Sequence, residues 1–141
     1  MRDLKYTLAY LIPLLTIIAI MCRGYYSFLT VFIIFGIVPL IEYILTPDAT
    51  NHSSEVSDSL AKKKIFNWLL YFNLPIVYGI GIYYLYIVST EHLETYELIG
   101  MLLSVAIVFS SNGINVAHEL GHRKESYHKW MSKLLLLPSM Y

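Results

Sequence analysis

Four apolar segments, each about twenty residues long, dominate this chain of 141 residues. They are nearly free of charged side chains, whereas a helix on the surface of a soluble bundle carries charges on its outer face. Hydrocarbon offers no hydrogen-bond partners, so a segment that crosses a bilayer must be a helix of about 20 residues. We therefore expect an all-α, polytopic membrane protein whose four transmembrane helices span residues 4–22, 26–45, 65–88 and 98–117.

The charge balance and the cysteine content exclude several other classes of protein. Ten basic and ten acidic residues cancel, and only 14% of the residues are charged, so a nucleic-acid binder with a basic face is excluded. The single cysteine, Cys22, excludes an internal disulfide framework and a cysteine-rich metal site.

Basic residues precede the first apolar segment, as in a signal peptide, but Met21-Cys22-Arg23 is a poor cleavage site. We expect that helix to be retained.

The basic residues are distributed unevenly between the two ends of the expected helices. Nine of the ten lie at the N-terminus, in the 46–64 loop or after residue 118, and only Arg23 lies on the opposite side. Lysine and arginine accumulate in cytoplasmic loops, so the N-terminus, the 46–64 loop and the segment after residue 118 are predicted to be cytoplasmic.

A fifth, shorter segment has a different pattern. Residues 126–137 place apolar side chains at the i, i+3, i+4 and i+7 spacing of one helix face, with polar residues between them. Twelve residues are too few to cross a bilayer. We expect an amphipathic surface helix with Trp130 buried in the interface, Lys129 and Lys133 at the headgroups, and His128 facing solvent. The alternative is the start of a further span.

The fourth apolar segment ends in the motif His118-Glu119-Leu120-Gly121-His122. Two histidines at i and i+4 share one helix face and can bind one metal ion. Polar side chains at the mouth of a membrane helix are costly and usually functional. The pair could hold zinc, with Glu119 as a general base, or it could contribute to a non-haem iron centre that activates dioxygen. An accidental copy of the motif in a membrane scaffold is the non-enzymatic alternative.

Small polar residues precede the motif at helical spacing. Ser104, Ser111, Asn115, His118 and His122 are separated by 7, 4, 3 and 4 positions, which places them along one face of a regular helix. We expect this polar seam to point into the bundle. Asn115 lies one turn before His118 and is predicted to orient it.

Residues 115–125 and 129–133 closely resemble the first histidine motif of the membrane alkane 1-monooxygenases, which belong to the integral-membrane fatty acid desaturase and hydroxylase superfamily. Pro39-Leu40-Ile41-Glu42, followed by Asp48 and Asn51, resembles the end of that family's second helix and its acidic loop.

The resemblance implies a non-haem di-iron enzyme of the bacterial inner membrane. Such an enzyme takes electrons from rubredoxin and uses dioxygen to hydroxylate the terminal methyl group of an alkane. His118 and His122 match ligand positions of the family, and Glu119 belongs to the motif with its role open. The bulky pair Ile34-Phe35 is a candidate limit on alkane length, but the sequence assigns no substrate-binding residue.

The family also has HxxxHH and HxxHH clusters, which residues 1–141 do not contain. The resemblance therefore implies that residues 1–141 are the N-terminal transmembrane portion of a hydroxylase domain, a fragment that is inactive alone. A fatty acyl desaturase or hydroxylase of the same superfamily and a zinc intramembrane protease remain the alternative functions.

The orientation can be tested by labelling single cysteines in intact cells, with Cys22 replaced by serine. Leu93→Cys lies in the loop without basic residues, so a membrane-impermeant maleimide should label it from outside. Glu55→Cys lies in the 46–64 loop and should react only after the cells are opened. The reverse labelling pattern would overturn the predicted orientation.

Overall fold

The computed structural model describes residues 9–45 and 64–140, with side chains in the second range described from Asn67 onward. All secondary structure in these ranges is helical, which confirms the expected all-α class. Short 3-10 and π-helical segments lie between the α-helices or follow them. The elements in chain order are α1 (Leu11–Cys22), η2 (Gly24–Phe28), α2 (Leu29–Phe32), η3 (Ile33–Ile37), α3 (Val38–Ile44), α5 (Lys64–Thr90), α6 (Thr95–Val108), η4 (Phe109–Ile114), α7 (Asn115–Gly121), α8 (Ser126–Leu136) and η5 (Leu137–Ser139).

Three of the expected spans are present as helices that are long and apolar enough to cross a membrane. They cover Gly24–Ile44, Asn67–Thr90 and Thr95–Gly121. The last is longer than predicted because α6, η4 and α7 form one continuous helix that carries the histidine motif. The first expected span appears as the 12-residue apolar helix α1. Its residues 4–8, and the loop that contains Asp48 and Asn51, lie outside the described residues.

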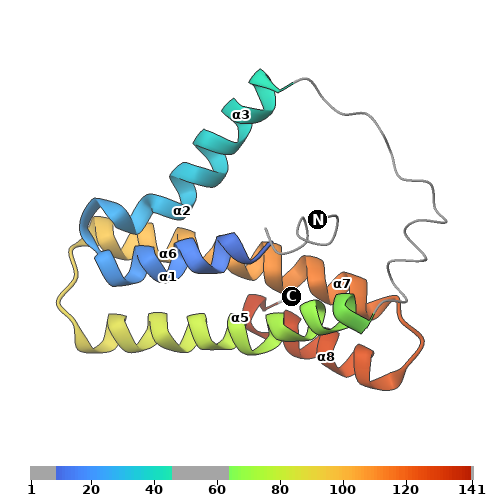
Figure 1. Cartoon of the computed structure of the whole chain (residues 1–141). Coiled ribbons are helices and arrows are strands. Elements are labelled where there is room, and N and C mark those ends of the chain that lie inside the picture. The colour runs from blue at the N-terminus through green and yellow to red at the C-terminus, as the bar shows by residue number, and fades with distance from the viewer. Residues whose placement is uncertain (1–8, 46–63, 141) are drawn as a thin grey trace.

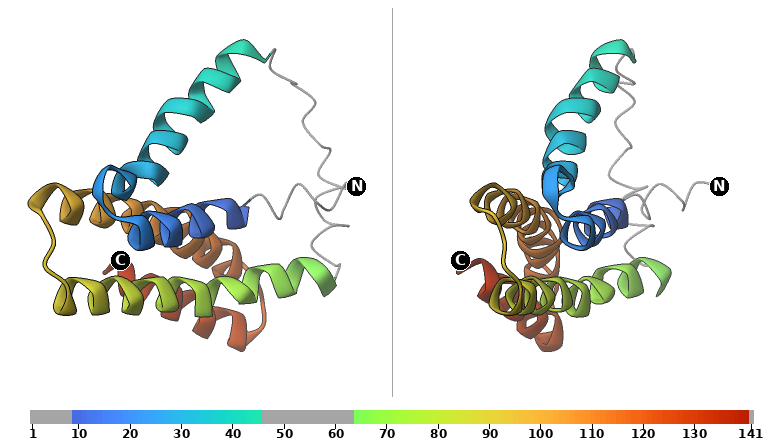
Figure 2. Two further views of the ribbon diagram at one scale, coloured as in Figure 1. Left: turned by 60° about the vertical axis from the view of Figure 1, so that its left-hand side comes forward. Right: turned by 90° about the vertical axis from the view of Figure 1, so that its left-hand side faces the viewer.

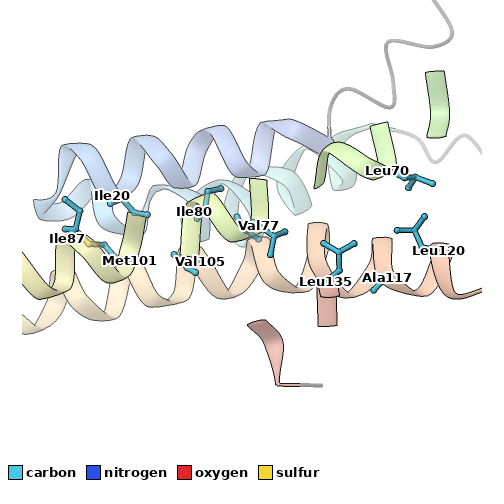
Figure 3. Close-up of a cluster of buried hydrophobic side chains, with 11 residues drawn as sticks. Ile20, Leu70, Val77, Ile80, Ile87, Met101, Val105, Ala117, Leu120 and Leu135 are labelled. Carbon is cyan, nitrogen blue, oxygen red and sulfur yellow. The ribbon is translucent and has the colours of Figure 1, made fainter. Parts of the chain in front are cut away.

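Helices α1, α5 and α6 lie side by side and form the body of the molecule (Figures 1 and 2). The apolar cluster of this body runs along α5 where it faces α6 and α7. It extends from Ile87 and Met101 at one end to Leu70 and Leu120 at the other, and Ile20 of α1 joins it (Figure 3). The helix formed by α2, η3 and α3 diverges from the body (Figure 2). Its residues from Phe35 to Leu45 are exposed.

Small and hydroxyl-bearing side chains join the α1–α2 hairpin to α6. Ser104 Oγ donates to the carbonyl of Ser27 at 2.9 Å, and the Thr16 and Thr30 hydroxyls lie 3.1 Å apart. Thr16 also donates to the Ser104 carbonyl at 3.3 Å. All four residues are fully buried. Small residues allow helix backbones to approach closely in membranes, where packing and interhelical hydrogen bonds replace the hydrophobic effect.

The turn between α1 and η2 is fastened to the beginning of α6. Arg23 and Gly24 both have positive φ angles, 55° and 53°, and the Gly24 N–H donates to Glu97 Oε1 at 2.6 Å. The second oxygen of Glu97 accepts from the Glu94 N–H at 2.9 Å, which completes a helix-capping box. Arg23 also pairs with Glu91 at 3.1 Å, and this hydrogen bond holds the pKa of the Glu91 carboxyl below its usual value. The turn therefore joins the loop that follows α5 to the start of α6.

Gly100 marks the closest approach of η2 to α6, and its replacement tests this packing. A Cβ atom at Gly100 would lie 2.3 Å from Ser27 Oγ and 2.9 Å from Phe28 Cδ2. We expect Gly100→Ala to destabilise the protein by about 1–3 kcal/mol through overpacking, measured by denaturant unfolding in detergent micelles. Gly79→Ala is the matched control, because a Cβ atom there meets nothing within 4 Å. Equal stability of the two variants would contradict the packing described.

Candidate functional site

A π-helical segment, η4 (Phe109–Ile114), lies directly before the helix that carries the histidine motif. A π-turn accommodates one extra residue, so the residues after it are rotated by roughly 100° relative to a regular α-helix. The prediction that the polar seam forms a single face pointing into the bundle is therefore wrong. Ser104 is fully buried, whereas Asn115, His118 and His122 are exposed.

A buried pair of asparagines anchors this π-helical segment, and the sequence analysis did not identify it. Asn112 is 2% exposed, and its Nδ2 donates to Asn73 Oδ1 of α5 at 2.8 Å and to the Ala9 carbonyl at 3.2 Å. Its Oδ1 accepts from Ser111 Oγ at 2.9 Å. A buried amide is costly unless it is hydrogen-bonded. The presence of Asn73 and Asn112 inside apolar segments was therefore the sequence signal that could have predicted this pair. The pair fixes the helix six residues before the motif begins at His118.

The candidate metal-binding residues lie at the end of that helix. His118 and Glu119 are on α7, and His122 is its C-cap with φ −77° and ψ −10°. All three side chains are exposed. Arg123 Nη2 lies 3.8 Å from Glu119 Oε1, and Arg123 Nη1 donates to Asn67 Oδ1 of α5 at 2.5 Å. The motif is therefore accessible, and its glutamate has a cationic neighbour that is held by α5.

The two histidines fit part of a metal-ligand set. They place two imidazoles one helical turn apart, the arrangement that a single ion requires of such a pair. Within residues 9–45 and 64–140, no third histidine, cysteine, aspartate or glutamate joins them to make a group that could hold a metal ion. An iron or zinc ion at His118 and His122 would need further ligands.

Helix α8 packs antiparallel to α7 and η4 (Figure 1), and the face that carries His128, Ser132 and Leu135 lies inward. His128, expected to face solvent, is only 2% exposed, and Ser132 Oγ donates to the Ala117 carbonyl at 2.7 Å. Trp130 is 67% exposed and belongs to an outward stripe. The expectation for His128 is wrong because α5 and α7 supply polar partners for this face. The stripe consists of Tyr127, Trp130, Leu134 and Leu137.

An apolar cavity of about 430 Å³ lies between α1, the helix from α2 to η3, and the helix from α6 to α7. Ile34 and Phe35 line it on one side, and Asn115 lines it three residues before His118. A larger apolar cavity of about 680 Å³ lies between α5 and the α6–η4 helix, next to η5. Asn115 therefore faces the smaller of these two cavities. Its role in orienting His118 stays a prediction.

Comparison with known proteins identifies several relatives, although no protein-family model matches the chain. The alkane 1-monooxygenase of Pseudomonas putida is 32% identical over 102 residues, which is 72% of this chain and 25% of that protein. Alkane 1-monooxygenase 1 of Alcanivorax borkumensis is 36% identical over 102 residues, which is again 72% of this chain and 25% of that protein. The alkane 1-monooxygenase of Ectopseudomonas oleovorans is 31% identical over 113 residues, or 80% of this chain and 28% of that protein. The chain spans about a quarter of the length of these relatives.

Proposed function

The chain is a relative of the alkane 1-monooxygenases over the part that it spans, and we propose that it contributes to a membrane non-haem iron monooxygenase. In this proposal the enzyme hydroxylates the terminal methyl group of an alkane with dioxygen and takes its electrons from a rubredoxin. The observation that carries the proposal is the exposed pair His118 and His122 at the end of an apolar helix long enough to span a membrane. Relatives that are named for alkane oxidation supply the reaction class.

The residues of the motif take distinct roles in this proposal. His118 and His122 hold iron through their imidazole nitrogens, together with ligands that the described residues do not supply. A di-iron centre, when bound, supplies the activation of dioxygen. Glu119 lies between the two histidines in sequence and can hold a proton on its carboxylate, and Arg123, 3.8 Å away, orients that carboxylate.

The cavity that ends at Asn115 is the proposed binding site for the alkane. Its lining is mostly apolar, which suits a hydrocarbon, and Asn115 at one end is one helical turn from His118. The alkyl chain would lie between α1, η3 and α6, with its terminal methyl group near Asn115. Ile34 and Phe35 then limit the length of the chain that fits.

The finer membrane arrangement is also part of the proposal. We assign α1 together with the residues before it as a fourth span, and α8 as a helix at the cytoplasmic surface of the bacterial inner membrane. The outward stripe of α8 is apolar, and Lys133 Nζ lies 5.6 Å from the centre of the Trp130 ring, as expected at a headgroup interface. The histidine pair then faces the compartment that contains rubredoxin.

Loss of either histidine should abolish hydroxylation. In the full-length enzyme that contains this chain, we expect His118→Ala and His122→Ala to lower bound iron and octane hydroxylation by at least about tenfold, because each removes a metal ligand. Iron is measured in the purified protein, and octanol is measured in membranes supplied with rubredoxin and its reductase. His92→Ala is the matched control, because this exposed histidine lies in the loop between α5 and α6. Normal iron content in both ligand variants would refute the assignment, and bound zinc in place of iron would favour a protease.

Shortening Ile34 should shift the enzyme toward longer alkanes. Ile34→Ala removes part of the cavity wall, so we expect the ratio of dodecane to octane hydroxylation to rise by about fivefold or more. Leu40→Ala on the same helix is the matched control, because Leu40 is 59% exposed and does not line the cavity. An unchanged ratio would show that the alkane binds elsewhere.

A further inference from the structure

Helix α5 contacts the turn between α7 and α8 at two points that are one helical turn apart. Asn67 accepts a hydrogen bond from Arg123 at 2.5 Å, and the Tyr71 hydroxyl lies 2.6 Å from His128 Nε2. Arg123 directly follows His122, and His128 is in the first turn of α8. The segment after the second candidate ligand is therefore held at both of its ends by α5.

The hydrogen bonds around His128 form a chain whose direction can be deduced. Glu125 Oε2 lies 2.9 Å from His128 Nδ1, and a carboxylate accepts, so Nδ1 carries the proton. In the neutral imidazole, Nε2 then accepts, and Tyr71 O–H is the donor. The imidazole is 2% exposed and packs against Tyr127, with ring centres 4.0 Å apart. Both of its nitrogens are therefore hydrogen-bonded, as a buried histidine requires.

The last turn of α7 depends on this neighbourhood. His122 is the C-cap, so the helical geometry that places its ring one turn from His118 ends at that residue. Helix ends fray unless their contacts fix them. Helix α8 supplies such contacts, because Ser132 donates to the Ala117 carbonyl and lies 3.3 Å from the position of a Cβ atom at Gly121. Whatever fixes α8 against α5 also fixes the last turn of α7.

We propose that Tyr71, His128 and Glu125 are positioning residues that keep His118 and His122 at the spacing needed to share one metal ion. The proposal rests on the proposed function only in that the two histidines bind a metal together. None of the three positioning residues touches the metal. They act through the placement of α8, and the short hydrogen bond between Tyr71 and His128 is the central contact.

The affinity of the histidine pair for a simple copper probe tests this proposal. Cu²⁺–iminodiacetate binds two histidines that lie one turn apart on a helix, and electron paramagnetic resonance of the full chain in detergent micelles measures the bound fraction. We expect Tyr71→Phe, which removes one hydroxyl group, to weaken copper binding by about fivefold or more. Glu125→Ala should weaken it in the same direction, because His128 then loses the acceptor that sets its tautomer. His118→Ala defines the background signal.

Tyr78→Phe is the matched control. Tyr78 is also on α5 and donates to α8, but its acceptor is the carbonyl of Leu134, far from the turn that follows His122. Copper binding by Tyr78→Phe should stay within about twofold of the unmodified chain. Equal copper affinity of Tyr71→Phe and the unmodified chain would overturn the proposal, as would equal losses in Tyr71→Phe and Tyr78→Phe. Absence of copper binding in the unmodified chain would overturn the metal site itself.

Discussion

The contact between η2 and α6 at Gly100 is the constraint on which the arrangement of the helices depends. Glycine allows Ser27 and Phe28 to pack directly on the α6 backbone, and Ser104 then reaches the Ser27 carbonyl. In a bilayer, apolar surface alone does not draw helices together, so close backbone approach and buried hydroxyl contacts select the neighbours. Once the α1–α2 hairpin is held there, α1 lies beside α6, and the cavity that ends at Asn115 forms between them.

The π-helical segment links this packing to the candidate metal site. Its Asn112 is satisfied by Asn73 of α5 and by the backbone of Ala9, partners that come from two other parts of the chain. The extra residue in the turn rotates α7, so that Asn115 faces a cavity while His118 and His122 stay exposed. π-turns inside helices are often found at functional sites, and here the turn separates a packing face from the exposed face that carries His118 and His122.

The local parts of the fold and of the site could be predicted from the sequence. Apolar runs of sufficient length predict membrane helices, and the i, i+4 spacing of His118 and His122 places them one turn apart in any helix. The side on which a residue lies was predicted less well. Ser104 and His118 do not share a face, and His128 is buried rather than exposed. These outcomes depend on the π-turn and on Tyr71, which is 57 residues away from His128 in the chain.

The sequence by itself determined that the chain is helical, that apolar helices long enough to cross a membrane are present, and that two histidines lie at the end of one of them. These properties follow from composition and from a period of a few residues, which a single helix already displays. Only the tertiary structure decided which faces meet, where the cavity lies, and that Tyr71 and His128 hold α8 beside the motif. The physical reason is that buried polar groups must find partners, and those partners lie on other helices.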